Sequence, residues 1–181
     1  MKALINIDYT FDFIEGKLPC GEPGMNIEAN ITGITKQFID AGDFTVFAID
    51  LHKLNDHYHP ESKLFPPHNI EGTEGRNLYG TLQELFKENQ DKPNIYWMDK
   101  TRYSAFAGTN LHIRLQERNI KELYLVGVCT DICILHTAVD AYNLGYSLHI
   151  FEDATASFNE MGHKWALDHF KNVLGATILS C

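Results

Sequence analysis

Residues 127–137 read GVCTDICILHT, and the rest of the chain is organised around this stretch. It follows an apolar run at residues 123–126, which is typical of a buried parallel strand. It leads into residues 132–144, which are apolar nearly all round and predict a buried helix. Cys133 would lie in the first helical turn, where backbone N–H groups and the helix dipole lower a thiol pKa. This position favours a cysteine nucleophile, and the alternative is a small apolar side chain in a buried helix.

Length and composition limit the classes of protein to consider. The chain has 181 residues, 44% of them hydrophobic and 22% charged, which suits one domain spanning residues 1–181. A net charge of −9 argues against nucleic acid or an anionic membrane as the main partner. No stretch resembles a signal peptide or a membrane span, so we expect a cytoplasmic protein. The four cysteines lack CxxC or zinc-finger spacing and are expected to be free thiols.

Apolar runs alternate with segments of helical periodicity along the whole chain. The expected strands cover residues 2–8, 44–50, 94–98, 121–127, 146–151 and 176–179. The expected helices cover residues 25–41, 78–89, 109–118, 132–144 and 159–172, with loops at 10–24 and 51–76. This alternation predicts an α/β fold, a three-layer α/β/α sandwich around a mostly parallel sheet of about six strands.

Reactive side chains follow four of the expected strands. Asp8 ends the first strand and Asp50 the second, Lys100 follows the third, and the Cys133 turn follows the fourth. Ligands of open parallel sheets bind beyond the carboxyl ends of the strands. We therefore expect these four groups to converge at one edge of the sheet, and this convergence strengthens the case for a nucleophile.

The loop at residues 51–76 is rich in histidine. Four of the nine histidines lie between positions 52 and 68. Asp50 and His52 point to the same side of an extended segment, and His68 follows two prolines that restrict it. A mixture of oxygen and nitrogen ligands suits Zn²⁺, Mn²⁺ or Fe²⁺, and the residues alone do not separate these ions.

Three aromatic residues lie near these motifs. Phe13, Phe65 and Phe106 are candidates to stack on an aromatic substrate ring. The alternative for each of them is a place in the hydrophobic core.

Asp8, the segment WMDKTRYSAF at 97–106 and the segment GVCTDIC at 127–133 together resemble the isochorismatase-like cysteine hydrolases. The segment IDLH at 49–52 and the loop after it resemble the nicotinamidases, and residues 59–80 resemble the streptococcal type. The resemblance implies hydrolysis of nicotinamide to nicotinate and ammonia in NAD salvage, with pyrazinamide as a second substrate. Two alternatives stay open: a related amidohydrolase acting on a carbamoyl or ureido substrate, and a non-catalytic ligand-binding protein.

The resemblance also implies roles for individual residues. Cys133 would form a thioester, Asp8 would transfer protons, and Lys100 would stabilise the thiolate and orient Asp8. The backbone N–H groups of Cys129 and Cys133 would form an oxyanion hole, with a cis peptide bond between Val128 and Cys129.

The same resemblance implies a divalent metal ion, Zn²⁺ ahead of Mn²⁺ or Fe²⁺, held by Asp50, His52, Glu61 and His68. Many nicotinamidases use a histidine six residues after the first one, but that position here is Tyr58. Glu61 is the ligand in the streptococcal type, and His57 and His59 remain alternatives to it. The expected partner is a small molecule, nicotinamide, and a homo-oligomer is left open.

Overall fold

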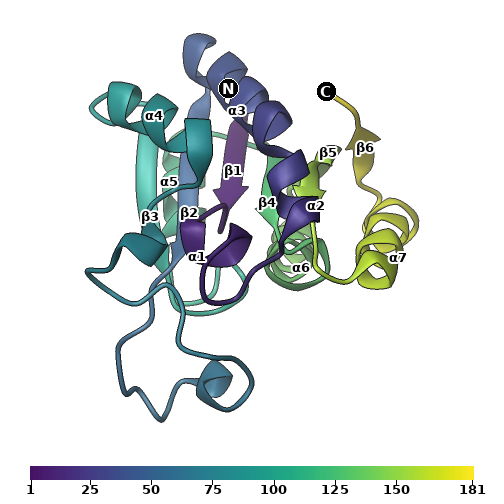
Figure 1. Cartoon of the computed structure of the whole chain (residues 1–181). Helices are drawn as coiled ribbons and strands as arrows, with labels where there is room; N and C mark the ends of the chain where they lie inside the picture. Colours follow the sequence, from purple (N-terminus) through teal and green to yellow (C-terminus); the bar gives the residue numbers. More distant parts are fainter.

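One parallel sheet organises the computed structural model, which describes all 181 residues. Its strands are β1 (Ala3–Ile7), β2 (Phe44–Asp50), β3 (Ile95–Lys100), β4 (Glu122–Val128), β5 (Ser147–Ala156) and β6 (Thr177–Leu179). Their order is β3-β2-β1-β4-β5-β6, and every neighbouring pair is parallel (Figure 1). The chain builds outward from β1 on one side and then crosses to the other, so the strand order reverses between β1 and β4. Ligands of such sheets bind at this reversal.

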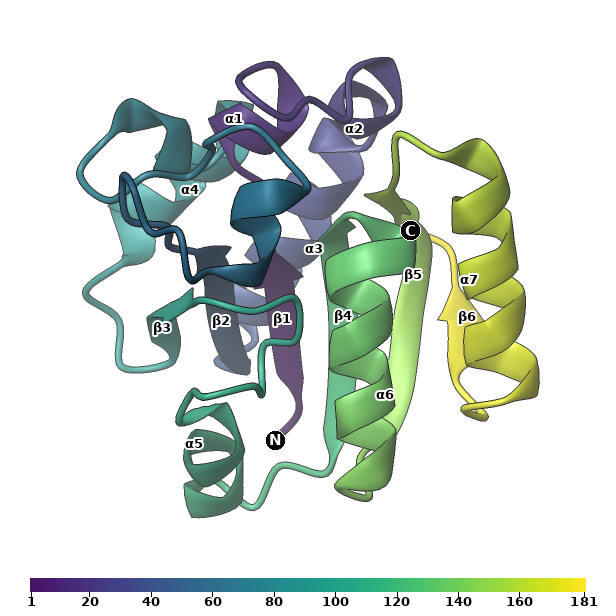
Figure 2. The same cartoon turned by 90° about the horizontal axis from the view of Figure 1, so that it is seen from below.

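Helices cover both faces of the sheet, which confirms the predicted three-layer sandwich (Figure 2). One face carries α2 (Glu22–Asn26), α3 (Glu28–Asp40) and α4 (Gly80–Asn89), and the other carries α5 (Leu111–Glu117), α6 (Leu135–Asn143) and α7 (Glu160–Asn172). Each layer has its own apolar core. Ile5 and Leu125 point into the first core with α5, α6 and α7, whereas Leu4 and Val126 point into the second core with α3 and α4. Burial on both faces explains why the strands read as continuous apolar runs.

The expected loops contain short helices that the sequence pattern did not indicate. α1 (Phe11–Ile14) lies within the expected loop at residues 10–24, and α2 extends two residues beyond its end. The helix expected from residue 25 begins at Glu28. Two 3-10 turns, Pro60–Lys63 and Glu74–Arg76, lie in the histidine-rich loop. Elements of three to five residues are too short to display a helical period.

The segment after β4 also differs from the prediction. Thr130–Ile134 forms a π-helical turn, and the regular helix α6 begins only at Leu135. Cys133 therefore sits in a π turn and not in the first turn of an α-helix. Gly127, just before this turn, has φ +120°, and a methyl group there would lie 2.0 Å from the Ile7 carbonyl oxygen. Glycine is required where β1 and β4 approach this closely.

None of the helices combines the length and the apolar character that a membrane span requires.

Candidate active site

Lys100 gathers the groups that follow the central strands. Its Nζ atom lies 2.6 Å from Asp8 Oδ2, 2.5 Å from Asp50 Oδ1 and 3.7 Å from Cys133 Sγ. It also donates to the Arg102 carbonyl at 3.2 Å. Asp8, Asp50, Lys100 and Cys133 are all buried, so a single cation faces two carboxylates and a thiol away from bulk water. In such surroundings these charges interact much more strongly than they would at the surface.

Asp8 has the electrostatics of a proton-transfer group. Its Oδ1 accepts the Asp50 N–H at 2.8 Å, and its backbone φ of 54° turns the chain sharply at the end of β1. Burial and the charge of Asp50 raise the pKa of Asp8 to about 6, against the lowering effect of Lys100. A carboxyl with such a pKa can both accept and release a proton near neutral pH.

Cys133 departs from the expectation of a lowered thiol pKa. Burial raises its pKa well above the ordinary value, and only the nearby Lys100 opposes this effect. The expected lowering was wrong because the sequence pattern reports the position in a helix but not the depth at which the side chain is buried. The resting thiol is neutral, so a nucleophilic Cys133 needs a base. The side-chain ligand atoms of Asp8, Asp50 and Cys133 lie within 4.8 Å of one another.

Four side chains beside this cluster form a potential metal site. The ligand atoms of Asp50, His52, Glu61 and His68 lie within 4.8 Å of one another. Asp50 Oδ2, His52 Nε2 and His68 Nε2 are buried and have no hydrogen-bond partner. Nδ1 of His68 donates to the Pro66 carbonyl at 2.7 Å, which leaves Nε2 as a lone-pair donor. Buried polar atoms without partners are costly, and a divalent cation would satisfy all of them. The residues present therefore fit a metal ion.

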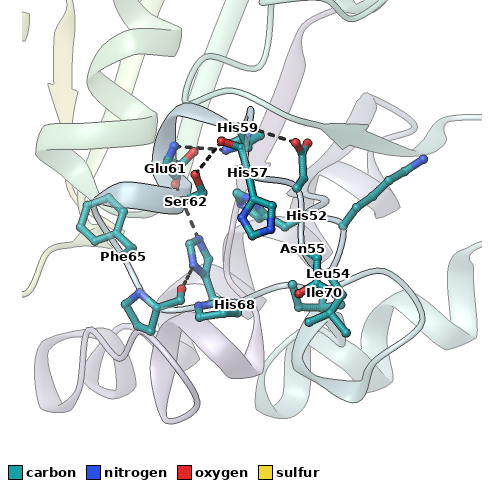
Figure 3. A pocket seen from close by; sticks show the side chains of 14 residues that line it. His52, Leu54, Asn55, His57, His59, Glu61, Ser62, Phe65, His68 and Ile70 are labelled. Carbon is teal, nitrogen blue, oxygen red and sulfur yellow. Dashed lines mark hydrogen bonds and ion pairs between the residues drawn. The ribbon is translucent and has the colours of Figure 1, made fainter.

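The histidine-rich loop and the end of β2 supply this quartet together. Asp50 and His52 come from the end of β2, Glu61 from the 3-10 turn, and His68 from the returning chain. Glu61 Oε2 and His68 Nε2 are 3.7 Å apart and face each other in Figure 3. A cavity of about 200 Å³ opens beside them, and Phe65 is part of its lining.

The two alternative histidines lie outside the quartet. His57 is exposed. His59 is buried, but both of its ring nitrogens are engaged. Nε2 is bonded to the Thr101 carbonyl at 2.7 Å, and Nδ1 accepts the Glu61 N–H at 3.3 Å. His59 thus contacts the backbone of Glu61 and is not one of the four grouped side chains.

The structure brings two of the three candidate aromatic residues to the site. The rings of Phe13 and Phe65 lie 5.0 and 6.3 Å from the ring of His68. Phe106 does not reach it, since its ring stacks on Tyr146 at 5.9 Å, beside the amino end of β5. The structure therefore does not group Phe106 with the other two candidates, and its contact with the substrate stays a prediction.

Two hydrogen bonds hold the backbone of the segment that carries Phe106. The Phe106 N–H donates to Ser104 Oγ, and Ser104 Oγ donates to Asp140 of α6. These bonds tie residues 104–106 to α6. Tyr103, which sequence reasoning missed, stays at the site: burial and the charges of Glu61 and Cys133 raise its pKa to about 12. Its place three residues after Lys100 was the available signal.

Comparison with known proteins agrees with this geometry. The family model of the isochorismatase domain matches residues 2–180. The chain belongs to the isochorismatase family. It is similar to the nicotinamidase/pyrazinamidase PncA of Bacillus subtilis, with 56% identity, a TM-score of 0.98 and coverage of 99% of this chain and 100% of that one.

Two further solved structures bear on the site. The pyrazinamidase/nicotinamidase of Streptococcus mutans is 51% identical with a TM-score of 0.97, covering 99% of this chain and 100% of that one. A pyrazinamidase of Pyrococcus horikoshii in complex with zinc is 25% identical with a TM-score of 0.86, covering 99% of both chains. The predicted family and fold are confirmed.

Proposed function

We propose that this chain is a metal-dependent nicotinamidase, which hydrolyses nicotinamide to nicotinate and ammonia through a thioester on Cys133. The observation that carries the proposal is the buried Lys100, which contacts Asp8, Cys133 and the potential metal ligand Asp50 at once. The names of the Bacillus subtilis and Streptococcus mutans structures support it, because both are nicotinamidase and pyrazinamidase enzymes that superpose over nearly the whole chain. Pyrazinamide is the second substrate that we propose.

Asp8 moves the protons in the first half of the reaction. It accepts the thiol proton of Cys133, and Lys100 stabilises the thiolate. The sulfur atom bonds to the amide carbon, and the carbonyl electron pair moves onto oxygen. When the carbonyl re-forms, the C–N bond breaks, and the nitrogen takes the proton from Asp8 and leaves as ammonia.

Asp8 has the same role in the second half. It accepts a proton from water, whose oxygen bonds to the thioester carbon. The C–S bond then breaks as the carbonyl re-forms, and the proton on Asp8 returns to the Cys133 sulfur. The product acid loses its remaining proton to solvent and is released as nicotinate. A pKa of about 6 suits Asp8 to accept and release protons in turn.

Cys129 and Cys133 are the residues that we propose as the oxyanion hole. Both would act through their backbone N–H groups, which would donate to the negative oxygen formed in each half of the reaction. The Val128–Cys129 peptide bond is cis, and the Cys129 N–H has no hydrogen-bond acceptor within the chain. A donor that is free inside a buried site supports this role.

Asp50, His52, Glu61 and His68 are the residues that would hold a divalent ion, and we propose Zn²⁺ ahead of Mn²⁺ or Fe²⁺. Two histidines with two carboxylates suit these ions, and the zinc complex of the Pyrococcus horikoshii pyrazinamidase supports the choice. When bound, the ion supplies a Lewis acid that can take a pyridine nitrogen. Phe13 and Phe65, whose rings flank His68, would pack against the substrate ring.

NAD salvage in a reducing cytoplasm is the setting that we propose. All four cysteines are free, and a reducing compartment keeps the Cys133 sulfur in the state that the mechanism requires.

Ammonia release from nicotinamide tests the proposal directly. We expect turnover with the zinc-loaded protein, its loss after treatment with a chelator, and its recovery when zinc is restored. Cys133→Ala should abolish turnover and retain the metal. Benzamide has the same shape without the ring nitrogen and should be a poor substrate. A buried site built to bind a polar group strongly rejects an analogue that lacks this group. Ammonia release from an N-carbamoyl amino acid but not from nicotinamide would favour the alternative amidohydrolase.

A further inference from the structure

The π turn that carries Cys133 is clamped to α7 by polar side chains. Thr130 Oγ1 forms a 2.8 Å hydrogen bond with His163 Nδ1 of α7. One residue later, Asp131 Oδ1 accepts the hydroxyl of Ser157 at 2.6 Å. Thr130 and Ser157 are both buried. Two successive residues of the nucleophile turn are therefore fixed by groups from the end of β5 and from α7, none of which belongs to the catalytic cluster.

Gly162 closes the clamp from the other side. It is the third residue of α7, and a methyl group at this position would lie 2.0 Å from Asp131 Oδ2 and 2.8 Å from both Asp131 Cγ and Asn159 Nδ2. The first turn of α7 is itself anchored, because Asn159 Oδ1 accepts the Gly162 N–H at 3.0 Å. The Asn159 N–H donates to Ser157 Oγ at 3.2 Å. The half-buried Asp131 carboxylate thus packs on one side against the first turn of α7, which leaves no room for a side chain at residue 162.

Movement of Asp131 would be transmitted to both groups of the proposed oxyanion hole. The Cys129 carbonyl accepts the N–H groups of Ile132 and Ile134 at 3.1 and 3.2 Å, which joins the start of the turn to the residues on both sides of Cys133. A displacement at residue 131 therefore shifts Cys129 and Cys133 together. Oxyanion donors act only when they are aimed at the position of the developing charge.

We propose that Asp131 is a positioning residue for hydrolysis. Held by Ser157 and by the close approach of Gly162, it fixes the orientation of the turn from Cys129 to Cys133, and it does so without touching the substrate. The effect on turnover rests on the proposed function, whereas the effect on the rigidity of the turn does not.

Gly162→Ala is the variant that tests the clamp, and Gly33→Ala is its matched control. Gly33 lies inside α3, and a methyl group there would meet no atom within 4 Å. We expect Gly162→Ala to lower kcat for nicotinamide by about tenfold, less than the 10²–10³-fold loss of a complete oxyanion donor. The KM and the zinc content should be unchanged, because both halves of the reaction slow together and the metal quartet lies elsewhere. Gly33→Ala should match the wild type.

Substitutions of Asp131 separate positioning from a general loss of structure. Asp131→Ala should lower kcat as Gly162→Ala does, whereas Asp131→Asn keeps an oxygen acceptor for Ser157 and should retain near-normal kcat. Combining Asp131→Ala with Gly162→Ala should cost less than the sum of the two single losses, because the alanine methyl then has no carboxylate to displace and meets only Asn159 Nδ2, at 2.8 Å. If the two losses add instead, the two residues act independently and the clamp is wrong.

Hydrogen exchange tests the clamp without any substrate. The amides of residues 129–134 should exchange faster in Gly162→Ala than in the wild type or in Gly33→Ala. Suppose that Gly162→Ala exchanges faster but that the wild-type protein releases no ammonia from nicotinamide. This result would support the clamp and reject the proposed function. Unchanged exchange together with unchanged kcat would overturn the clamp, and so would a raised KM at constant kcat. Should Gly162→Ala fail to fold, Ser157→Ala removes one donor to Asp131 and carries the same expectations.

Discussion

Lys100 is the residue on which the site depends most. Its single ammonium forms ion pairs with both Asp8 and Asp50, so the proposed proton-transfer group and a proposed metal ligand share one counterion. Burial by itself lowers the pKa of a lysine, but the two carboxylates outweigh it and raise the pKa of Lys100 well above its ordinary value. The two carboxylates thus keep the fully buried side chain charged, which ties the stability of the fold to the chemistry of the site.

Lys100→Met should abolish turnover and also destabilise the protein. Methionine is similar in volume but leaves two buried carboxylates without their cation, and breaking a buried ion pair costs about 3–5 kcal/mol. Urea unfolding at neutral pH measures this loss. Lys87→Met, on an exposed position of α4, is the control and should unfold as the wild type does. A Lys100→Met protein with wild-type stability would mean that the carboxylates do not depend on this ammonium.

His59→Phe should weaken zinc binding although His59 is not in the quartet. Phenylalanine keeps the ring that packs 4.5 Å from His52, but it loses the bonds to the Thr101 carbonyl and to the Glu61 N–H. Loss of such supporting contacts typically weakens metal affinity by about 10–100-fold. Competition with a chelator of known affinity measures the change, with exposed His57→Phe as the control. If His57→Phe releases the metal and His59→Phe does not, the quartet has been assigned wrongly.

At the scale of elements, α7 is linked to the nucleophile turn through a histidine. His163 forms the hydrogen bond to Thr130 and is about half buried. Desolvation lowers its pKa, while the negative charges of Asp131, Glu152 and Glu160 oppose the effect and Lys164 adds to it. The neutral imidazole is therefore the form that the folded protein favours.

Mild acid should loosen this link. A histidine with a lowered pKa in the folded state binds its proton more readily after unfolding, where its pKa is ~6.5. Its contribution to stability is complete above pH ~6.5 and is lost as the pH falls toward the folded-state pKa. The difference between the urea midpoints at pH 7.5 and pH 5.5 should therefore be larger for the wild type than for His163→Gln. Parallel losses in the two proteins would show that His163 does not carry this dependence.

At the scale of the whole molecule, alternation of apolar runs and helical periods was enough to predict the fold. All six strands and the five longer helices were predicted near their observed positions, because burial on both faces leaves a strong pattern in the sequence. The short α1 and the π turn at Thr130–Ile134 were not predicted. Their geometry depends on neighbouring chain segments, such as the approach of β1 to Gly127, and leaves no period of its own.

The site was predictable to the extent that topology alone places residues. Asp8, Asp50, Lys100 and Cys133 meet because parallel strands end at the same edge. The orientation of individual side chains was not predictable in this way. The ring of Phe106 stacks on Tyr146, and burial raises the thiol pKa of Cys133. Neither property can be read from spacing in the sequence.

Zinc should stabilise the whole molecule by tying the histidine-rich loop to the sheet. This loop extends below the body of the protein in Figure 1, and the proposed ligands come from the end of β2, from the 3-10 turn at Pro60–Lys63 and from the returning chain. A ligand that binds only the folded state adds about 2.7 kcal/mol when its free concentration is 100 times its Kd. We therefore expect chemical unfolding to require more urea with zinc than with a chelator, and amides of residues 53–67 to exchange more slowly.

Two variants make this last prediction specific to the quartet. Glu61→Ala removes one proposed ligand and should lose most of the zinc-dependent stabilisation, because the remaining groups bind the ion more weakly. Cys133→Ala removes the proposed nucleophile, which lies outside the quartet, and should keep the full effect. Equal stabilisation of both variants would place the ion elsewhere. Zinc-dependent protection that disappears in Cys133→Ala would move it to the second cluster of potential ligands, formed by Asp8, Asp50 and Cys133.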